Sequence, residues 1–264
     1  MKKSFLFAAM AILLISCTQD NPQPPTMLYD SIYVFDVPNE RDTRLLYKYY
    51  YQYDDAGNQI EQILNGVKFT STFDANRNLV EQIRYTSNNL GEWLLTEKEL
   101  YAYNSKNQRI RMELYQSYAD TQWTRLSAAE YTYSKDGNTR YETRYLAHPN
   151  TDTIWHKGII QFNSHGDPVE IIDSMLLSEK ETWVSMLYAT YTYTYDSHNN
   201  VTYVKEVQAD NKSDEYRQME ENTYDYEYDS EGRILTRTQH YHYVARMPGN
   251  DINNSYTRKY MYFY

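Results

Sequence analysis

The fold is decided by a repeated phrase whose first copy reads Tyr-Lys-Tyr-Tyr-Tyr-Gln-Tyr-Asp-Asp-Ala-Gly-Asn, residues 47–58. Every second residue from 47 to 53 is a tyrosine, and a period of two places these rings on one face of a β-strand. Asp54 can bond its own backbone two residues further on, and Gly57 tolerates the positive φ of a tight hairpin turn. The phrase therefore predicts a strand that ends in a hairpin turn.

The phrase occurs seven times along the chain. Each copy joins an alternating strand to a second strand through a short turn rich in Asp, Asn, Ser and Gly, and an aromatic residue opens each turn. The turns are 53–58, 73–78, 103–108, 133–138, 162–167, 195–200 and 228–233. A last alternating strand, 256–264, ends the chain without a turn. A motif repeated at this spacing indicates one structural unit repeated in space.

Seven hairpins and their flanking strands amount to about fifteen or sixteen strands. At ~4.8 Å per strand a flat sheet of that size would be ~75 Å wide, and open sheets beyond ~10 strands tend to curl or split. We therefore expect residues 30–264 to form one all-β domain, an antiparallel meander that is strongly curved or barrel-like. The strand after the turn at 103–108 predicts its two faces: Ile110, Met112 and Leu114 alternate with Arg109, Arg111 and Glu113. One face should be apolar and aromatic and the other charged.

The N-terminus has the pattern of a signal peptide. Lys2 and Lys3 precede an apolar run at 5–15 that is too short for an ordinary membrane-spanning helix. We assign residues 1–16 to the signal peptide. Leu14-Ile15-Ser16-Cys17 resembles the lipobox of bacterial lipoproteins, and that resemblance implies that Cys17 is lipidated and becomes the first mature residue. Residues 17–29 contain three prolines and are expected to form a tether of ~35 Å if extended.

Charge narrows the choice of partners. The chain has 26 Lys and Arg against 36 Asp and Glu, a formal net charge of −10. Nucleic acids and anionic lipid surfaces both select clustered Lys and Arg, so neither is expected as a partner. Attachment to a membrane would rest on the lipid at Cys17, at a cell-envelope location in the outer membrane, facing either the periplasm or the surface.

The four tryptophans fall at comparable places before their turns: Trp93, Trp123, Trp155 and Trp183. One interpretation is that each Trp begins the strand leading into a hairpin and packs at the rim of the sheet. The other is a ladder of stacking platforms for a ligand such as a sugar, because Trp and Tyr supply large rigid contact areas. The sequence leaves both open, and these four residues are the candidate ligand-binding aromatics.

Motifs for catalysis are missing from the sequence. There is no Gly-rich phosphate loop, no Gly-x-Ser-x-Gly elbow, no His-Glu-x-x-His and no pair of cysteines. His240 and His242 share a strand face at a spacing that could offer two imidazoles to one metal, but no third ligand is visible. We therefore expect no catalytic residues, no metal, no cofactor and no enzymatic activity.

Two resemblances emerge from these motifs. Tyr53-Asp54-Asp55-Ala56-Gly57-Asn58 and residues 228–235, Tyr-Asp-Ser-Glu-Gly-Arg-Ile-Leu, resemble the YD repeat of Rhs and teneurin-type proteins over residues ~47–264. The lipobox, the Tyr-rich repeats and the size are also similar to uncharacterised surface lipoproteins of gut-type Gram-negative bacteria, some assigned a porin-like β fold. That resemblance implies a β fold at the cell surface and brings no known activity.

Two functional classes remain after these observations. The first is a lipid-anchored, non-catalytic binding or structural module that presents Tyr and Trp to a glycan or protein. The second is an outer-membrane β-barrel, favoured by the strand number and by Tyr260, Tyr262 and Tyr264, which alternate to the C-terminus as barrel assembly signals do. A lipid-facing band should be aliphatic in mid-strand with aromatics at its two edges, whereas here Tyr runs through strand middles. The mean hydropathy of −0.83 also favours the first class.

Overall fold

The computed structural model describes residues 28–39, 42–118, 122–147, 152–177, 182–212, 214–246 and 251–264. The signal peptide, Cys17 and residues 17–27 of the predicted tether lie outside these ranges. The strands are β1 (Ser31–Asn39), β2 (Asp42–Tyr53), β3 (Gln59–Leu64), β4 (Val67–Phe73), β5 (Leu79–Ser87), β6 (Trp93–Tyr103), β7 (Arg109–Tyr118), β8 (Gln122–Tyr133), β9 (Thr139–Leu146), β10 (Thr153–Phe162), β11 (Pro168–Leu177), β12 (Thr182–Tyr195), β13 (Val201–Ala209), β14 (Gln218–Tyr228), β15 (Ile234–Ala245) and β16 (Ile252–Phe263). No helix in the described ranges is long and apolar enough to cross a bilayer.

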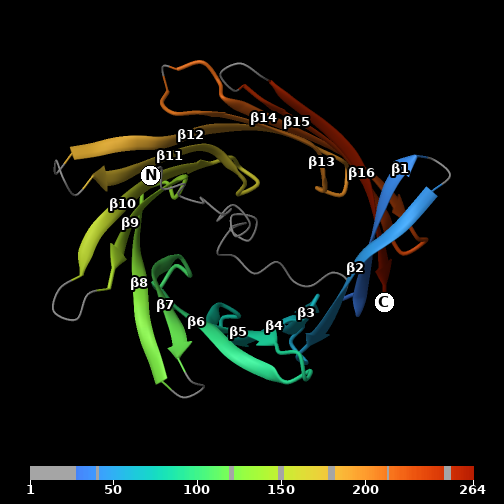
Figure 1. Cartoon of the computed structure of the whole chain (residues 1–264), viewed down its shortest axis with the longest axis horizontal. Helices are drawn as coiled ribbons and strands as arrows, with labels where there is room; N and C mark the ends of the chain where they lie inside the picture. Colours follow the sequence, from blue (N-terminus) through green and yellow to red (C-terminus); the bar gives the residue numbers. More distant parts are fainter. Residues whose placement is uncertain are drawn as a thin grey trace.

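The sixteen strands form a closed antiparallel barrel (Figure 1). Each strand pairs with its neighbours in the chain, and β16 also pairs with β1 through Ile32 opposite Tyr262 and Val34 opposite Tyr260. Val34 at this seam has no exposed surface. The predicted all-β meander of fifteen or sixteen strands is confirmed, and it closes. Closure pairs both edges of the sheet, which in an open sheet of this width would stay exposed.

Six of the seven predicted turns share one geometry, and the turn at 133–138 differs because the Ser134 amide donates to the carbonyl of Thr139, one residue further on. In the first, the Gly57 amide donates to the Asp54 carbonyl at 2.9 Å and the Asp54 amide donates to the Asn58 carbonyl at 2.9 Å. This is a type I turn followed by a residue at positive φ. The positive-φ residues of the seven turns are Gly57, Arg77, Asn107, Gly137, Gly166, Asn199 and Gly232.

Arg77 occupies the positive-φ position that is Gly or Asn in the other six turns. Its φ is 66°, and its Nε donates to Asn58 Oδ1 of the preceding hairpin at 3.0 Å. A side-chain contact between neighbouring hairpins thus accompanies a backbone conformation that non-Gly residues adopt at some cost.

A β-bulge follows six of the seven turns, and it changes which face some residues occupy. After the turn at 103–108 the register shifts between Ala102 and Tyr103, so that Arg109 pairs with Tyr103 and Arg111 with Ala102. Arg109 therefore joins the tyrosine face, and its guanidinium lies 5.0 Å from the Tyr101 ring centroid. Its predicted place on the charged face is wrong, because strict alternation ignores the extra residue of a bulge.

The tyrosine face is the inward wall of the barrel. Side chains on the concave face of a closed sheet converge, so the more buried face is the inner one. Ala129, Tyr131 and Ala189 on this face are 0%, 6% and 0% exposed. Register places the alternating tyrosines of β2, β6, β12, β14 and β16 on this side, whereas Tyr50 of β2 and Tyr188 of β12 lie on the outward face.

The prediction of one apolar face and one charged face is wrong. The inward wall also holds Arg140 and Glu142, which are 6% and 5% exposed. Their nearest nitrogen and oxygen lie 4.0 Å apart, and Arg144 bonds the same carboxylate. Charge is tolerated there because opposite charges pair with one another, and because a barrel of this strand number is too wide to be filled as an apolar core.

Candidate functional site

The inward tyrosines tie neighbouring hairpins together through their hydroxyl groups. One end of the barrel holds the seven repeat turns and is called the turn end here. At this end, each of five tyrosines donates to a backbone carbonyl of the preceding or adjoining segment. The pairs are Tyr53 to Tyr29 (3.2 Å), Tyr103 to Leu79, Tyr133 to Arg109, Tyr226 to Val201 and Tyr264 to Ile234 (2.9 Å each). The repeat therefore carries its own cross-hairpin bond, and these hydroxyls are already used.

Other inward tyrosines donate to carboxylates. Tyr191 donates to Glu206 at 3.0 Å, and Tyr101 bonds Glu99. Burial raises the pKa of Tyr49 and of Tyr131 to about 12, so these phenols stay neutral across the physiological range. The tyrosines of the inward wall thus present aromatic rings whose hydroxyls are hydrogen-bond donors.

The described inward arginines differ in their partners. Arg84 pairs with Glu97 at 2.9 Å, and Arg144 pairs with Glu142. Arg237 on β15 lies against rings instead, with its guanidinium carbon 4.0 Å from the Tyr260 centroid and 5.4 Å from that of Tyr224.

The four tryptophans lie near the starts of β6, β8, β10 and β12, at the end of the barrel opposite the seven repeat turns. Alternate strands in one sheet stand ~10 Å apart, so the four positions form one row. Trp93, Trp123 and Trp183 share the outward face. Trp155 sits where the β9–β10 register shifts, and its Nε1 is buried without a hydrogen-bond partner. The row itself agrees with the equivalence inferred from sequence, and whether it binds a ligand stays a prediction.

Each outward tryptophan carries a lysine over its ring, a feature that sequence reasoning missed. The ammonium nitrogens of Lys68, Lys98 and Lys157 lie 5.3, 4.8 and 4.4 Å from the ring centroids of Trp93, Trp123 and Trp183. A nearly constant spacing in the sequence could have predicted these contacts, because the lysines precede their tryptophans by 25, 25 and 26 residues. Ala128 occupies the equivalent register position before Trp155, which has no lysine at that site.

The lysines change what the row can do chemically. Lys68 also covers Tyr85 and Lys98 also covers Tyr115, at 4.6 and 5.2 Å. A cation over an aromatic face is attracted by the ring quadrupole and occupies that face. A ligand stacking on these rings would therefore use the face that the lysine leaves free.

The two histidines considered for metal binding lie on the outward face of β15, beside a hollow of ≈ 750 Å³. His240 contacts Thr257 Oγ1 at 3.1 Å and Asp225 Oδ2 at 3.2 Å, while the Nε2 of His242 is buried without a partner. Among the described residues no group of three or more His, Cys, Asp or Glu is placed to hold a metal ion.

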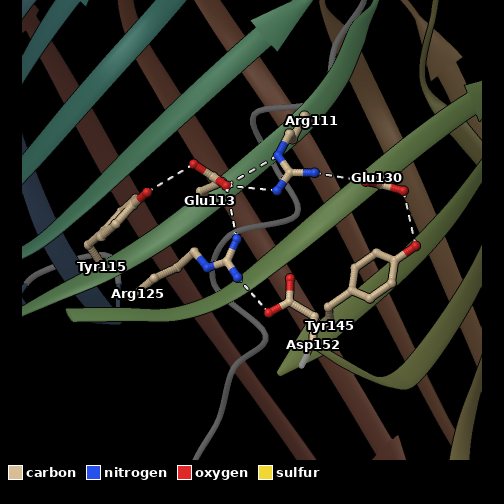
Figure 2. A network of polar contacts seen from close by, with 7 residues as sticks. All are labelled: Arg111, Glu113, Tyr115, Arg125, Glu130, Tyr145 and Asp152. Atoms are coloured by element: carbon tan, nitrogen blue, oxygen red, sulfur yellow. Dashed lines mark hydrogen bonds and ion pairs between the residues drawn. The ribbon is translucent and has the colours of Figure 1, made fainter. Parts of the chain in front are cut away.

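A continuous polar network covers the outward face of β7, β8 and β9 (Figure 2). Glu113 accepts hydrogen bonds from Arg111 at 2.8 Å, Tyr115 at 3.0 Å and Arg125 at 3.3 Å. Arg111 also reaches Glu130 at 2.8 Å. These contacts hold the pKa of Glu113 below its usual range, with the Arg111 hydrogen bond as the largest cause. The network places paired charges in the middle of outward-facing strands.

Comparison with known proteins adds little to this description. No family model matches the chain. No curated protein matches it either. Among solved structures, a protein of unknown function from Bacteroides fragilis NCTC 9343 shares 13% identity over 47% of this chain and 91% of its own, with a TM-score of 0.41. Porin-like proteins from Bacteroides uniformis ATCC 8492 and Bacteroides vulgatus ATCC 8482 share 11% and 10% identity over 91% and 88% of this chain. They are covered over 98% and 97% of their own lengths, with TM-scores of 0.34 and 0.35. Values this low carry no conclusion about function, and the closed barrel rests on this chain's own strand pairing.

Proposed function

We propose that the protein is a lipid-anchored, non-catalytic module of the bacterial cell envelope, whose barrel works in water and binds a glycan or a protein through its Tyr- and Trp-rich surfaces. The lipid would be attached at Cys17 in the lipobox-like segment of the outer-membrane lipoprotein. The folded barrel would then stand beside the membrane, held by a Pro-rich tether.

The observation that carries the proposal is charge in mid-strand on both faces of the barrel. The outward face carries the network around Glu113 (Figure 2). It also carries the Lys205–Glu221 pair at 3.1 Å on β13 and β14. The inward face carries the Arg84–Glu97 pair and the cluster around Glu142. A membrane barrel needs an uninterrupted apolar band on its lipid face, where a Lys or Arg at mid-depth costs ~2–4 kcal/mol. Neither face of this barrel offers that band.

The alternative, an outer-membrane barrel, shares the closed β topology with the proposal. What separates the two is the environment of the outward face. The proposal has water around Lys98, Arg111 and Glu113, whereas the alternative has lipid there. Solubility without detergent therefore distinguishes them.

The test is a Cys17→Ala substitution in the full chain, expressed in a Gram-negative host. Loss of the lipidation site should move the protein from the membrane fraction to the soluble fraction, because the proposal attaches the protein to the bilayer through this lipid alone. Thr18→Ala is the matched control and should leave the protein with the membranes. A Cys17→Ala protein that stays membrane-bound until detergent is added would instead favour the outer-membrane barrel.

The role of the tryptophan row is tested separately. If Trp123 contacts a ligand, Trp123→Ala weakens glycan or protein binding while the melting temperature changes little. If it serves packing only, the melting temperature falls and binding is unaffected. Trp155→Ala is the comparison variant, because that ring lacks the lysine contact.

A further inference from the structure

Arg237 lies on the inward wall of the barrel and differs from the other arginines there. Among the described residues no carboxylate lies within ion-pair distance of it, and its Nε is buried without a hydrogen-bond partner. Arg84 and Arg144, on the same inward wall, both have carboxylate partners. The chain has ten more acidic than basic side chains, so a shortage of carboxylates does not explain the difference.

An unpaired guanidinium in a sheltered position is unfavourable. Removing a charge from water is costly unless a partner compensates, and two aromatic rings return only part of that cost. The site is therefore left with unused capacity to bind an anion.

The rings fix the orientation of that capacity. Tyr260 lies 4.0 Å below the guanidinium carbon, and its own hydroxyl is anchored to Gln239 Oε1 at 2.7 Å. Tyr226 and Tyr260 stand opposite Arg237 on the two neighbouring strands. A guanidinium stacked on a ring keeps the N–H groups at its edge available, and their fork matches the two oxygens of a carboxylate.

Further donors surround this position. No described residue accepts a hydrogen bond from the Tyr224 or the Tyr262 hydroxyl, and the Tyr29 ring packs edge-on against Tyr262 with centroids 5.2 Å apart. Burial raises the pKa of both free phenols, so they remain protonated donors. Cation, donors and aromatic faces converge on one part of the inward wall.

We propose that Arg237, with Tyr224, Tyr260 and Tyr262, forms a binding site for the carboxylate of a sugar acid. The guanidinium holds the carboxylate, the phenols donate to its oxygens or to ring hydroxyls, and the tyrosine rings pack on the apolar face of the sugar. A sugar acid fits better than a simple anion because rings with polar edges match a molecule that is polar at its rim and apolar on its faces. This inference rests on the proposed binding function and narrows its ligand to an acidic saccharide.

The experiment is calorimetric titration of the full chain with sodium D-glucuronate, with D-glucose and sodium acetate as matched probes. Glucuronate should bind about tenfold or more tightly than either, since each probe lacks one half of the recognition. Glucose binding as tightly as glucuronate would overturn the role of the charge. Acetate binding as tightly would reduce the site to a simple anion site and overturn the sugar.

Variants test the residues directly. Arg237→Met keeps an apolar stem over Tyr260 and removes the fork, so glucuronate affinity should fall by about tenfold or more. Arg84→Met, on β5 in another part of the inward wall, should leave the affinity unchanged. If Arg237→Met does not fold, as judged by circular dichroism, Tyr262→Phe replaces it and should weaken glucuronate by about threefold to tenfold. Unchanged affinity in either folded variant contradicts the assignment.

Failure of this inference is distinguishable from failure of the proposed function. A water-soluble Cys17→Ala barrel that gives no heat with glucuronate overturns the sugar-acid site and leaves the tethered module standing. A Cys17→Ala chain that requires detergent overturns the proposed function, whatever the titration shows.

Discussion

Tyr103 lies at the end of β6 and donates its hydroxyl to the carbonyl of Leu79, in the preceding hairpin, at 2.9 Å. Tyr103→Phe removes that donor and leaves the ring. Because a hydrogen bond of this kind contributes about 0.5–1.5 kcal/mol net, the free energy of unfolding should fall by that amount in urea denaturation. Tyr50→Phe is the control, since that outward ring is 47% exposed and should change stability little. Equal losses in both variants would show that the cross-hairpin bond contributes nothing specific.

Gly232 tests the repeated turn at the level of one backbone angle. Its φ is 78°, and a Cβ placed on it would meet no heavy atom within 4 Å, so only backbone strain penalises a side chain there. Gly232→Ala should therefore lower the free energy of unfolding by about 1 kcal/mol. Gly232→Asn should cost much less, because Asn107 and Asn199 occupy the equivalent position at 59° and 64°. Equal costs for Ala and Asn, measured by urea denaturation, would contradict the equivalence of the turns.

Residue-level prediction from sequence succeeds where one residue type has one backbone reason. Asp, Asn or Ser at the turn entry and Gly or Asn at the fifth position predicted the hairpin turns for that reason. The lysines over Trp93, Trp123 and Trp183 were missed, because they come from strands 25 or 26 residues earlier and need the register to be known. Arg237 was missed because its distinction is a missing neighbour, which only the assembled inward wall reveals.

Among the elements, β16 has a special place because it pairs with both β15 and β1. A chain truncated before Tyr256 should lose the barrel seam, since two strands then expose unpaired backbone groups. We expect a marked fall in melting temperature or aggregation. The comparison is the substitution Met261→Thr, which keeps every backbone pairing of β16 and changes one outward side chain. A truncated chain with the full melting temperature would show that closure through β16 does not stabilise the fold.

Element prediction was strong at one end of the barrel and weak at the other. The seven repeat turns all lie at the end of the barrel where Tyr53 donates to the Tyr29 carbonyl and Tyr264 to the Ile234 carbonyl. Each of these turns was predicted from its residues. The turn at Asn65 and Gly66, with φ of 46° and 76°, lies at the opposite end and was not part of the phrase. The connections at that end differ in length and residue type, so no repeat marks them.

At the scale of the whole molecule, the inward tyrosines predict how the barrel responds to alkali. Burial raises the pKa of Tyr29, Tyr49 and Tyr131 to about 12, whereas a phenol in the unfolded chain titrates near 10. Between these values the unfolded chain has released protons that the folded chain still holds. Stability contributed by these phenols is therefore complete below pH 10 and is lost as pH rises toward 12.

The measurement is simultaneous recording of tyrosinate absorbance and β-sheet circular dichroism from pH 8 to 13. We expect both signals to change together above pH 10, as a cooperative unfolding. A control with Tyr50→Phe should shift the transition little. Tyrosinate absorbance that rises to completion near pH 10 with the circular dichroism intact would contradict burial of the tyrosine wall.

The fold as a whole was predictable up to its closure. Counting hairpins gave the strand number and the antiparallel order, because both are local properties of a repeat. Whether the sheet curls or closes depends on β1 finding β16, and Ile32, Val34, Tyr260 and Tyr262 reveal this only through their pairing. The binding surface was less predictable still, since the polar pairs on both faces cross from one hairpin to another.

The seam between β1 and β16 also constrains how such a protein can change size. Chain direction alternates around the ring, so the two end strands meet antiparallel only when the number of strands is even. Duplicating or deleting one hairpin keeps that parity and changes the circumference by ~10 Å, or roughly 3 Å in diameter. Gaining or losing a single strand would force a parallel seam. The girth of the barrel is thus adjustable only in whole hairpins, which makes copy number, more than side-chain substitution, the natural means of resizing what it encloses.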